Sequence, residues 1–279
     1  MPDRVLICTD LDRTLLPNGA EPESPGARDR FRALVSRPEV ELAFVSGRHR
    51  ALVEEAIAQY GLPHPDYAIG DVGTSIYSVQ DGEWSQWPAW DAVLEHDWGP
   101  RDGAALVPLF RDIEALTPQE DEKQGRFKSS YYAPVSVDVG QLKQQMLRRL
   151  AEENLPSRII WSVDENTDSG LVDVLPESAS KLHAVRFLME HSGHRLANTL
   201  FAGDSGNDLE VLCSDVHSVL VANATDSVRE QALRLARQAG TLQALYTARG
   251  GLRGMNGNYS AGILEGLVHF MPDTDAWIA

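Results

Sequence analysis

Two carboxylates, Asp10 and Asp12, stand at the end of an apolar run, VLICT. The run predicts a short buried strand over residues 4–9, and two like charges there repel each other unless a cation lies between them or one is protonated. In open α/β sheets, ligands bind beyond the carboxyl ends of the strands. A hard cation such as Mg²⁺ prefers oxygen ligands, so the pair indicates a metal-assisted reaction. Taken alone, it also fits a solvated turn with two surface acids.

A second polar group ends the next predicted strand, ELAFVSGR, which covers residues 41–48. Here Ser46, Gly47 and Arg48 offer a hydroxyl and exposed amides at a strand–helix junction, which can hold phosphate oxygens. The same three residues also fit an ordinary helix N-cap serine followed by a glycine turn. These three residues therefore indicate a phosphate site only if they lie beside Asp10 and Asp12.

Acids recur after a later predicted strand, in the segment FAGDSGNDLEVL of residues 201–212. Asp204 and Asp208 suit a metal ion, and the small residues between them allow close backbone approach; a loop of turn formers is the alternative. Lys181 begins a predicted helix, where its charge opposes the helix dipole. A buried anion nearby would offset that cost, although a lysine at such a place is ordinarily solvated.

The elements that must position these groups alternate along the first 80 residues, which predicts a parallel sheet covered by helices. Alternation resumes after residue 180. Residues 81–176 differ, because helix and strand patterns follow there in an order that suggests an antiparallel sheet with helices on one face. The helices expected in this lobe are 101–116 and 141–155, and the strands are 127–139, 158–164 and 170–175.

We therefore expect an α/β protein with two parts. A Rossmann-like parallel-sheet core is built from residues 1–80 and 177–279, and a separate α+β lobe, residues 81–176, is inserted into it. The four tryptophans between Trp84 and Trp98 could contact a ligand, but packing is the expected role.

Composition narrows the function. The formal charge of −16 over 279 residues repels phosphate backbones, so no nucleic-acid partner is expected. An anionic small substrate is also repelled, and its site needs a local cation. No apolar run reaches the length of a membrane span, and the N-terminus shows no secretory signal. Together with only two cysteines, Cys8 and Cys213, this predicts a cytoplasmic protein without a membrane partner.

The motifs DLDRT, SGR, Lys181 and GDSGND match, in order, the four motifs of the haloacid-dehalogenase-like hydrolases, and the sequence is similar to that superfamily. The resemblance implies that Asp10 is a nucleophile forming an aspartyl-phosphate and that Asp12 is the general acid and base. It also implies a Mg²⁺ cofactor, held by Asp10, the backbone carbonyl of Asp12 and Asp204, with Asp208 supporting the waters of the metal.

The same resemblance assigns the phosphate contacts. Ser46 and Lys181 would hold the phosphoryl oxygens, together with the rest of the SGR turn, Gly47 and Arg48, and Asn207 would orient the phosphate. The inserted lobe lies between SGR and Lys181, because too few residues separate Asp12 from Ser46 for a large insertion. That placement resembles the class in which an α+β cap closes over small phosphorylated substrates.

Within that class the sequence resembles the sucrose-phosphate phosphatases, through PDYAIGDVGTSIY, EKQGRFKSSYY, VDVLPESASK and SAGILEGLVHF. The likeness implies hydrolysis of sucrose 6-phosphate to sucrose and phosphate. It places Gln124 and Lys128 of the cap toward the sugar, with Phe127 packing on a ring face; an exposed loop and strand edge is the alternative. By analogy only, a sugar-phosphate synthase would be a partner.

The sequence departs from the family pattern at Arg13, where Asn or Gly is usual, and at Leu182, where Gly is usual. Other substrates therefore stay open, such as mannosylfructose phosphate or another glycoside phosphate. A phosphomannomutase-like phosphotransferase is a further alternative, since the cap carries cations for a second phosphate at Lys123, Arg126, Lys128 and Arg148. A sugar-phosphate sensor without catalysis is the third, and the presence of both Asp10 and Asp12 argues against it.

Overall fold

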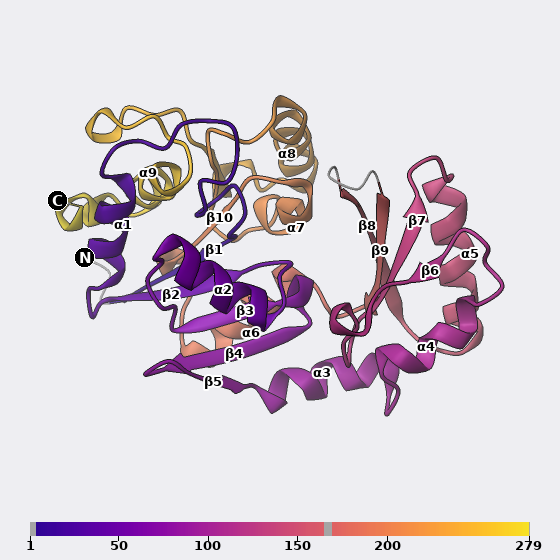
Figure 1. Ribbon diagram of the computed structural model, residues 1–279. Coiled ribbons are helices and arrows are strands. Elements are labelled where there is room, and N and C mark those ends of the chain that lie inside the picture. The colour runs from indigo at the N-terminus through magenta and orange to yellow at the C-terminus, as the bar shows by residue number, and fades with distance from the viewer. Residues whose placement is uncertain (1–3, 165–168, 279) are drawn as a thin grey trace. The chain divides into compact units, whose positions relative to one another are not determined.

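The computed structural model describes residues 4–164 and 169–278, and it divides into two compact units (Figure 1). The core unit comprises Met1–Gln86 and Lys181–Ala279, and the cap unit comprises Trp87–Ser180. The sequence placed these boundaries at 80/81 and 176/177. The first lies later because β5 (Glu83–Gln86) pairs with β4 (Ser75–Gln80) and so belongs to the core sheet.

The core unit is built on one eight-stranded sheet in the order β12-β11-β10-β1-β2-β3-β4-β5. Strands β12 to β3 are parallel, and β4 and β5 continue the sheet in antiparallel pairing. The parallel strands are β1 (Val5–Thr9), β2 (Val40–Val45), β3 (Tyr67–Gly70), β10 (Thr199–Gly203), β11 (Ser218–Leu220) and β12 (Leu245–Thr247). Strand β1 is buried at every position, which its unbroken apolar sequence requires of a central strand covered on both faces.

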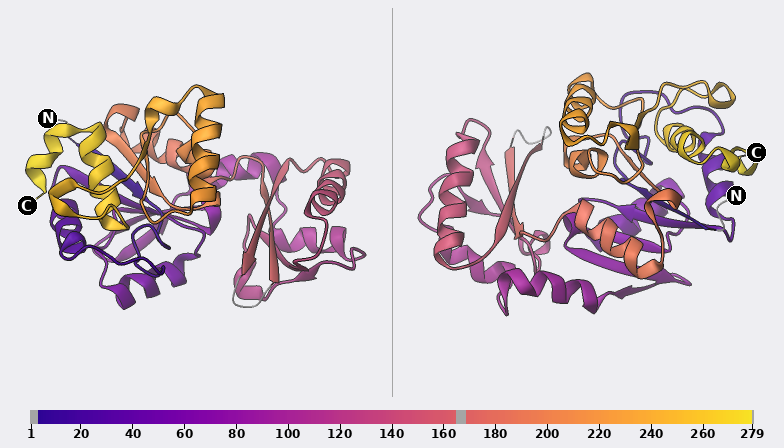
Figure 2. Two further views of the ribbon diagram at one scale, coloured as in Figure 1. Left: turned by 90° about the horizontal axis from the view of Figure 1, so that it is seen from above. Right: turned by 180° about the vertical axis from the view of Figure 1, so that it is seen from behind.

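Helices lie on both faces of the core sheet (Figure 2), as expected for parallel strands joined by crossovers. They are α1 (Ala27–Val35), α2 (Arg50–Tyr60), α6 (Lys181–Ser192), α7 (Leu209–Leu212), α8 (Asp226–Ala239) and α9 (Ser260–Phe270). The predicted parallel α/β core is therefore confirmed. The segment after GDSGND forms a single helical turn, α7, preceded by a 3₁₀ turn over Gly206–Asp208.

Helix α9 is the most deeply buried helix of the core unit, because small residues bring it close to β11. A Cβ atom at Gly266 would lie 2.4 Å from the Cβ of Val219, so only glycine permits this approach. Between the packed positions, the Glu265 side chain is 7% exposed and holds the preceding glycine-rich loop. Its carboxylate accepts hydrogen bonds from the Tyr246 hydroxyl and from the backbone N–H groups of Arg249 and Gly250, at 2.7–2.9 Å.

The cap unit contains a four-stranded antiparallel sheet in the order β6-β7-β9-β8. Its elements are α3 (Pro88–Trp98), α4 (Gly103–Phe110), β6 (Thr117–Pro118), β7 (Ser129–Pro134), α5 (Val139–Glu152), β8 (Ser157–Asp164) and β9 (Ser169–Pro176). The predicted α+β fold is confirmed, although the sequence patterns did not reveal α3. Two of its tryptophans, Trp90 and Trp98, are buried, and the Trp98 indole donates to the Ser157 hydroxyl, so these two serve packing.

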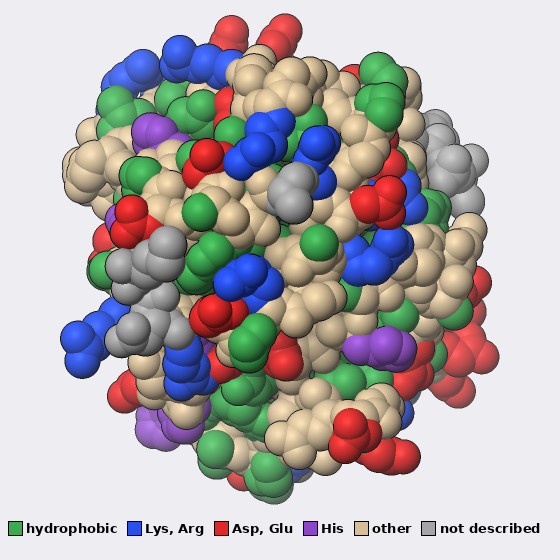
Figure 3. Space-filling view, turned by 90° about the vertical axis from the view of Figure 1, so that its left-hand side faces the viewer, with side chains coloured by type: hydrophobic (Ala, Val, Ile, Leu, Met, Phe, Trp, Pro, Cys, Tyr) green, Lys and Arg blue, Asp and Glu red, His purple; other side chains and the backbone are tan. Residues whose placement is uncertain are grey.

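Among the described residues, no helix is both long and apolar enough to cross a membrane. On the face shown in Figure 3, basic and acidic side chains are interspersed. Several exposed charges of the core unit pair locally, as Arg32 does with Asp29 and Arg253 with Asp275. Such exposed pairs contribute little to stability, and the fold depends on its buried sheet and on buried polar anchors such as Glu265.

The variant Glu265→Gln tests the anchoring of the glycine-rich loop. A glutamine amide would point N–H atoms at backbone donors, so we expect the free energy of unfolding to fall by about 2 kcal/mol. Urea denaturation measures the change. Glu230→Gln, an exposed position on α8, is the matched control and should leave stability within about 0.5 kcal/mol of the wild type. Equal stability of both variants would contradict the anchoring role.

Candidate active site

Three neighbouring strands end at one edge of the core sheet and carry the polar groups found in the sequence. Thr9 of β1 is paired with Phe44 of β2 and with Ala202 of β10. The residues that follow on these strands therefore emerge side by side. This register places Asp10, Ser46 and Asp204 at the carboxyl edge where ligands bind in such sheets.

Three buried carboxylates form the centre of the site. One carboxylate oxygen from each of Asp10, Asp204 and Asp208 lies within 4.8 Å of the others. Lys181, at the start of α6, reaches into the same group: its Nζ lies 3.0 Å from Asp10 Oδ1, 2.7 Å from Asp208 Oδ1 and 3.2 Å from Asn207 Oδ1. The structure thus brings together five of the residues singled out in the sequence.

The charges of this cluster do not balance. Burial, the first cause, raises the pKa of Asp10 to about 8 and that of Asp204 to about 7, with neighbouring carboxylates adding to both shifts. The adjacent carboxylates outweigh burial at Lys181 and raise its pKa above the usual value, so it stays an ammonium. One ammonium faces three carboxylates, and the surplus is met either by protons or by a cation. An oxygen-only donor set of this kind fits a hard divalent ion.

Asp208 is held more firmly than the other two acids. Its Oδ2 accepts from the backbone N–H groups of Asp204 and Ser205, both at 3.1 Å, while Oδ1 meets Lys181. A Cβ atom at Gly203 would lie 2.6 Å from the Asp208 carboxyl carbon, so this glycine is required for the close approach. Asp208 therefore braces the loop and the lysine, and Asp204 keeps the freer carboxylate.

Asp12 lies in a different environment. Its carboxylate accepts two hydrogen bonds from the Arg48 guanidinium, at 2.8 and 2.7 Å, and one from the Asn18 amide at 2.7 Å. Burial alone would raise the pKa of Asp12, but these hydrogen bonds hold it below its usual value. The sequence suggested Arg48 as a phosphate contact; in this structure its guanidinium binds Asp12 instead.

The SGR turn is fixed by strained backbone. Asp71 and Val72 both have positive φ, 50° and 60°, which is rare for a β-branched residue. Their N–H groups donate to the carbonyls of Arg48 and Ser46, at 3.0 and 3.2 Å. Ser46 is buried and its hydroxyl accepts from Arg48 N–H, while Gly47 is exposed. Strain of this kind collects at functional sites because the surroundings must over-determine it.

Sequence reasoning missed three supporting residues. The Thr14 hydroxyl donates to Asp204 Oδ1 at 3.1 Å, and its place as the threonine of the DLDRT motif was the signal that could have identified it. Asn18 binds Asp12, as described. The Asn223 amide donates to the Arg13 carbonyl at 2.6 Å and ties the segment after β11 to the loop after β1. No pattern in the sequence indicated the two asparagines: Asn223 acts through a contact 210 positions away, and Asn18, six positions from Asp12, lies in a loop whose path the sequence did not predict.

The sugar contacts expected in the cap unit lie on one segment. Gln124 uses its amide within the unit: it donates to the carbonyls of Gln119 and Ser130 and accepts from Ser130 N–H, at 2.8–2.9 Å. Lys128 is 8% exposed, and Phe127 is buried, with the Arg126 guanidinium 4.9 Å from its ring centre. Their roles toward a sugar stay predictions.

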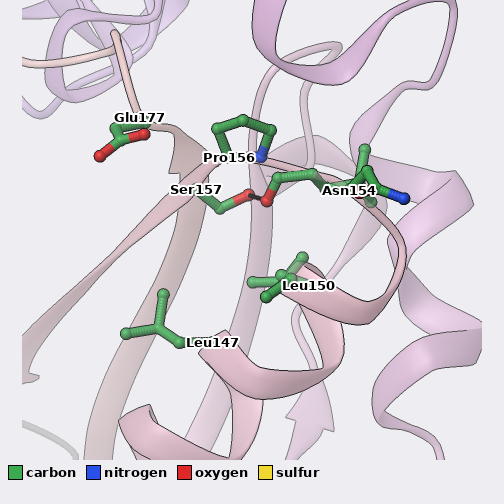
Figure 4. Close-up of a pocket in the computed structure, with 8 residues that line it drawn as sticks. Leu147, Leu150, Asn154, Pro156, Ser157 and Glu177 are labelled. Atoms are coloured by element: carbon green, nitrogen blue, oxygen red, sulfur yellow. Dashed lines mark hydrogen bonds between the residues drawn. The ribbon is translucent and has the colours of Figure 1, made fainter.

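A separate pocket of about 400 Å³ lies within the cap unit, at the junction of α5 and β8 (Figure 4). Its lining is mainly apolar, with Leu147, Leu150 and Pro156 beside Ser157 and Glu177. None of the site residues expected from the sequence lines this pocket, so nothing connects it with the candidate active site.

Comparison with known proteins bears on the whole chain. The family model described as sucrose-6F-phosphate phosphohydrolase matches residues 3–271. A HAD-like hydrolase of Nitrosococcus oceani is 52% identical over 278 residues, which cover all of this chain and 75% of that protein. Sucrose-phosphatase 1 of Nicotiana tabacum is 30% identical over 96% of this chain, and the chain spans 59% of its length.

Two further relatives are named for the sugar phosphates on which they act. The mannosylfructose-phosphate phosphatase of Agrobacterium fabrum is 30% identical over 78% of this chain and 83% of its own length. The sucrose-phosphatase of Synechocystis sp., solved in complex with sucrose and phosphate, superimposes with a TM-score of 0.74 at 25% identity, over 96% of this chain and 98% of that one. These matches confirm the expected haloacid-dehalogenase-like hydrolase fold and the expected family of sugar-phosphate phosphatases. The chain belongs to the sucrose-6F-phosphate phosphohydrolase family.

Proposed function

We propose that this chain is a Mg²⁺-dependent phosphatase of a disaccharide phosphate, with sucrose 6-phosphate as its substrate. The observation that carries the proposal is the buried cluster of Asp10, Asp204, Asp208 and Lys181, with Asp12 beside it. A structural role does not explain it, because surplus buried carboxylates cost stability. The family match supplies the class of substrate.

The chemistry of the chain's own residues follows from their environments. A carboxylate oxygen of Asp10 attacks phosphorus and forms an aspartyl-phosphate as the bond to the sugar oxygen breaks. Asp12 gives its proton to that leaving oxygen. In the second step Asp12 takes a proton from a water molecule as the water attacks phosphorus; the bond between phosphorus and Asp10 breaks, phosphate is released and Asp10 is restored. Lys181 and the Ser46 hydroxyl bind the phosphoryl oxygens, and Asn207 orients them.

Asp10 and Asp204 would hold the metal ion directly, with the backbone carbonyl of Asp12, and Asp208 would support it from behind through the loop that it braces. The ion supplies charge screening between an anionic nucleophile and an anionic substrate. In a chain with a formal charge of −16, that screening is a condition for binding any phosphate ester.

For Asp12 to move a proton, one of its oxygens has to leave the hydrogen bonds of Arg48 or Asn18. The held carboxylate cannot donate a proton, because both oxygens are used as acceptors. Arg48 thus binds the general acid, Asp12. Arg48 can contact a phosphate only after it has released Asp12.

Mannosylfructose phosphate is the second candidate substrate. The similarity to the Agrobacterium fabrum phosphatase equals that to the tobacco sucrose-phosphatase, at 30% identity each. Both disaccharides contain a fructose unit, so the core chemistry is the same for either. The difference between them lies in the glycosyl unit, which the cap residues Gln124 and Lys128 would contact.

Phosphate release from a panel of disaccharide and simple sugar phosphates, with Mg²⁺, tests the proposal. We expect sucrose 6-phosphate to give the highest kcat/KM, and Asp10→Asn to lower it on the order of 10³-fold or more. Asp226→Asn, an acid with a 98% exposed side chain on α8, is the control and should behave as wild type. Preference for another glycoside phosphate would assign that compound as the substrate in place of sucrose 6-phosphate. Activity of Asp10→Asn equal to that of the wild type would contradict the mechanism.

The raised pKa of Asp204 predicts that the metal-free protein becomes less stable as the pH rises. A carboxyl with a folded pKa of about 7, against about 4 when unfolded, destabilises the metal-free fold as pH rises through that window. We expect Asp204→Asn to be the more stable metal-free protein by about 2 kcal/mol at pH 8, with little difference at pH 4.5. Thermal unfolding with EDTA measures it.

With Mg²⁺ present, the wild type should become more stable than Asp204→Asn. The ion should raise the Tm of the wild type at pH 8 more than at pH 6, because protons compete for Asp10 and Asp204 at the lower pH. Asp204→Asn should lose most of that rise, whereas Asp226→Asn should keep it. A metal-free Asp204→Asn protein that is less stable than wild type at pH 8 would contradict the proposed surplus of buried charge.

A further inference from the structure

The Arg13 side chain is a cation placed beside the carboxylate cluster. Its Nε lies 3.6 Å from Asp204 Oδ2, close enough for strong attraction but too far for a hydrogen bond. Within the described part of the chain, this buried Nε has no hydrogen-bond partner, although the side chain as a whole is 41% exposed. The contact is therefore one of charge alone, with no directional bond to fix it.

The backbone of Arg13 is fixed, in contrast to its side chain. Its φ of 58° is in the left-handed region, its N–H donates to Asn18 Oδ1 at 2.8 Å, and its carbonyl accepts from the Asn223 amide at 2.6 Å. Asn223 is fixed in turn, because its Oδ1 accepts from the Tyr259 N–H at 2.9 Å. Two asparagines thus hold the backbone of Arg13 beside the site, while no hydrogen bond to Asp204 fixes its guanidinium.

The neighbouring loop approaches the guanidinium without crowding it. A Cβ atom at Gly19 would clash with the Tyr259 hydroxyl at 2.7 Å, but its distance of 3.6 Å to Arg13 Nε would be an ordinary contact. Since part of the side chain already reaches solvent, it can turn away from Asp204 without moving the backbone.

We propose that the Arg13 guanidinium is an internal counter-cation for Asp204 that a divalent metal ion must displace, so that Arg13 sets the apparent metal affinity of the site. In the metal-free protein it compensates part of the surplus negative charge. Once an ion binds at Asp204, a guanidinium at 3.6 Å is repelled and turns outward. Arg13 is a positioning residue in this account, and the inference rests on the proposed metal site.

Calorimetric titration of the metal-free protein with Mg²⁺, and with Mn²⁺ as a second probe, tests this directly. We expect Arg13→Asn to bind either ion about tenfold more tightly than wild type, because one competing charge is gone. Asparagine tolerates the left-handed backbone, so the fold should be kept. The Mg²⁺-induced rise in Tm should be larger for Arg13→Asn, which gives a second readout independent of catalysis.

Two further variants separate charge from shape. Arg13→Lys keeps the charge and should retain the wild-type affinity. Arg32→Asn removes the same charge at a similarly exposed position, 44%, where Arg32 pairs with Asp29 on α1, and should also leave affinity unchanged. Equal or weaker binding by Arg13→Asn overturns the inference, and so does tighter binding by Arg13→Lys.

The outcome is distinguishable from failure of the proposed function. If no variant binds either ion, the metal site itself is wrong and both proposals fall. If the affinities change as expected but no sugar phosphate is hydrolysed, the counter-cation role stands and only the assigned reaction is overturned.

Discussion

Electrostatic compensation around Lys181 is the constraint on which the core unit depends. A buried ammonium and buried carboxylates are each costly alone, and each removes part of the cost of the others. The arrangement requires β1 and β10 to be neighbours, α6 to begin at the same sheet edge, and glycine at position 203, where any side chain would meet Asp208. Much of the architecture at this edge can be understood as the means of holding one cation among three anions.

Two carboxylates separated by a single residue, Asp10 and Asp12, acquire opposite properties from this arrangement. Asp10 lies among other acids in a buried place, which raises its pKa, whereas Asp12 is clamped by Arg48 and Asn18, which lowers its pKa. Different environments for paired acids are the usual basis for dividing nucleophilic and proton-transfer roles. The same sequence pattern thus yields two chemical groups, and the distinction comes from tertiary neighbours.

The sequence predicted the fold class and the sheet edge because those depend on local patterns. Unbroken apolar runs identify β1 and β2, and parallel strands have to bring their carboxyl ends together. The roles of Arg48 and Gln124 in this structure were not predictable in that way. Whether a guanidinium binds a carboxylate or a phosphate depends on side-chain rotamers and on partners such as Asn18. Helix α3 was missed because its apolar residues, Trp90 and Trp98, stand among prolines and acids without a clear period.

The order of elements in the core sheet has a consequence for how the chain folds. Lys181 and Asp10 are 171 positions apart, and Thr14 and Asp204 are 190 apart, with the whole cap unit between them. Strand β1 pairs with β2 on one side, but its other neighbour, β10, comes only after residue 198. During synthesis, one edge of this strand, which is buried at every position, stays unpaired until the cap has been made. Since unpaired apolar edges invite aggregation, the nascent N-terminal half is the stage at which this protein is most vulnerable, and the carboxylate cluster is among the last contacts to form.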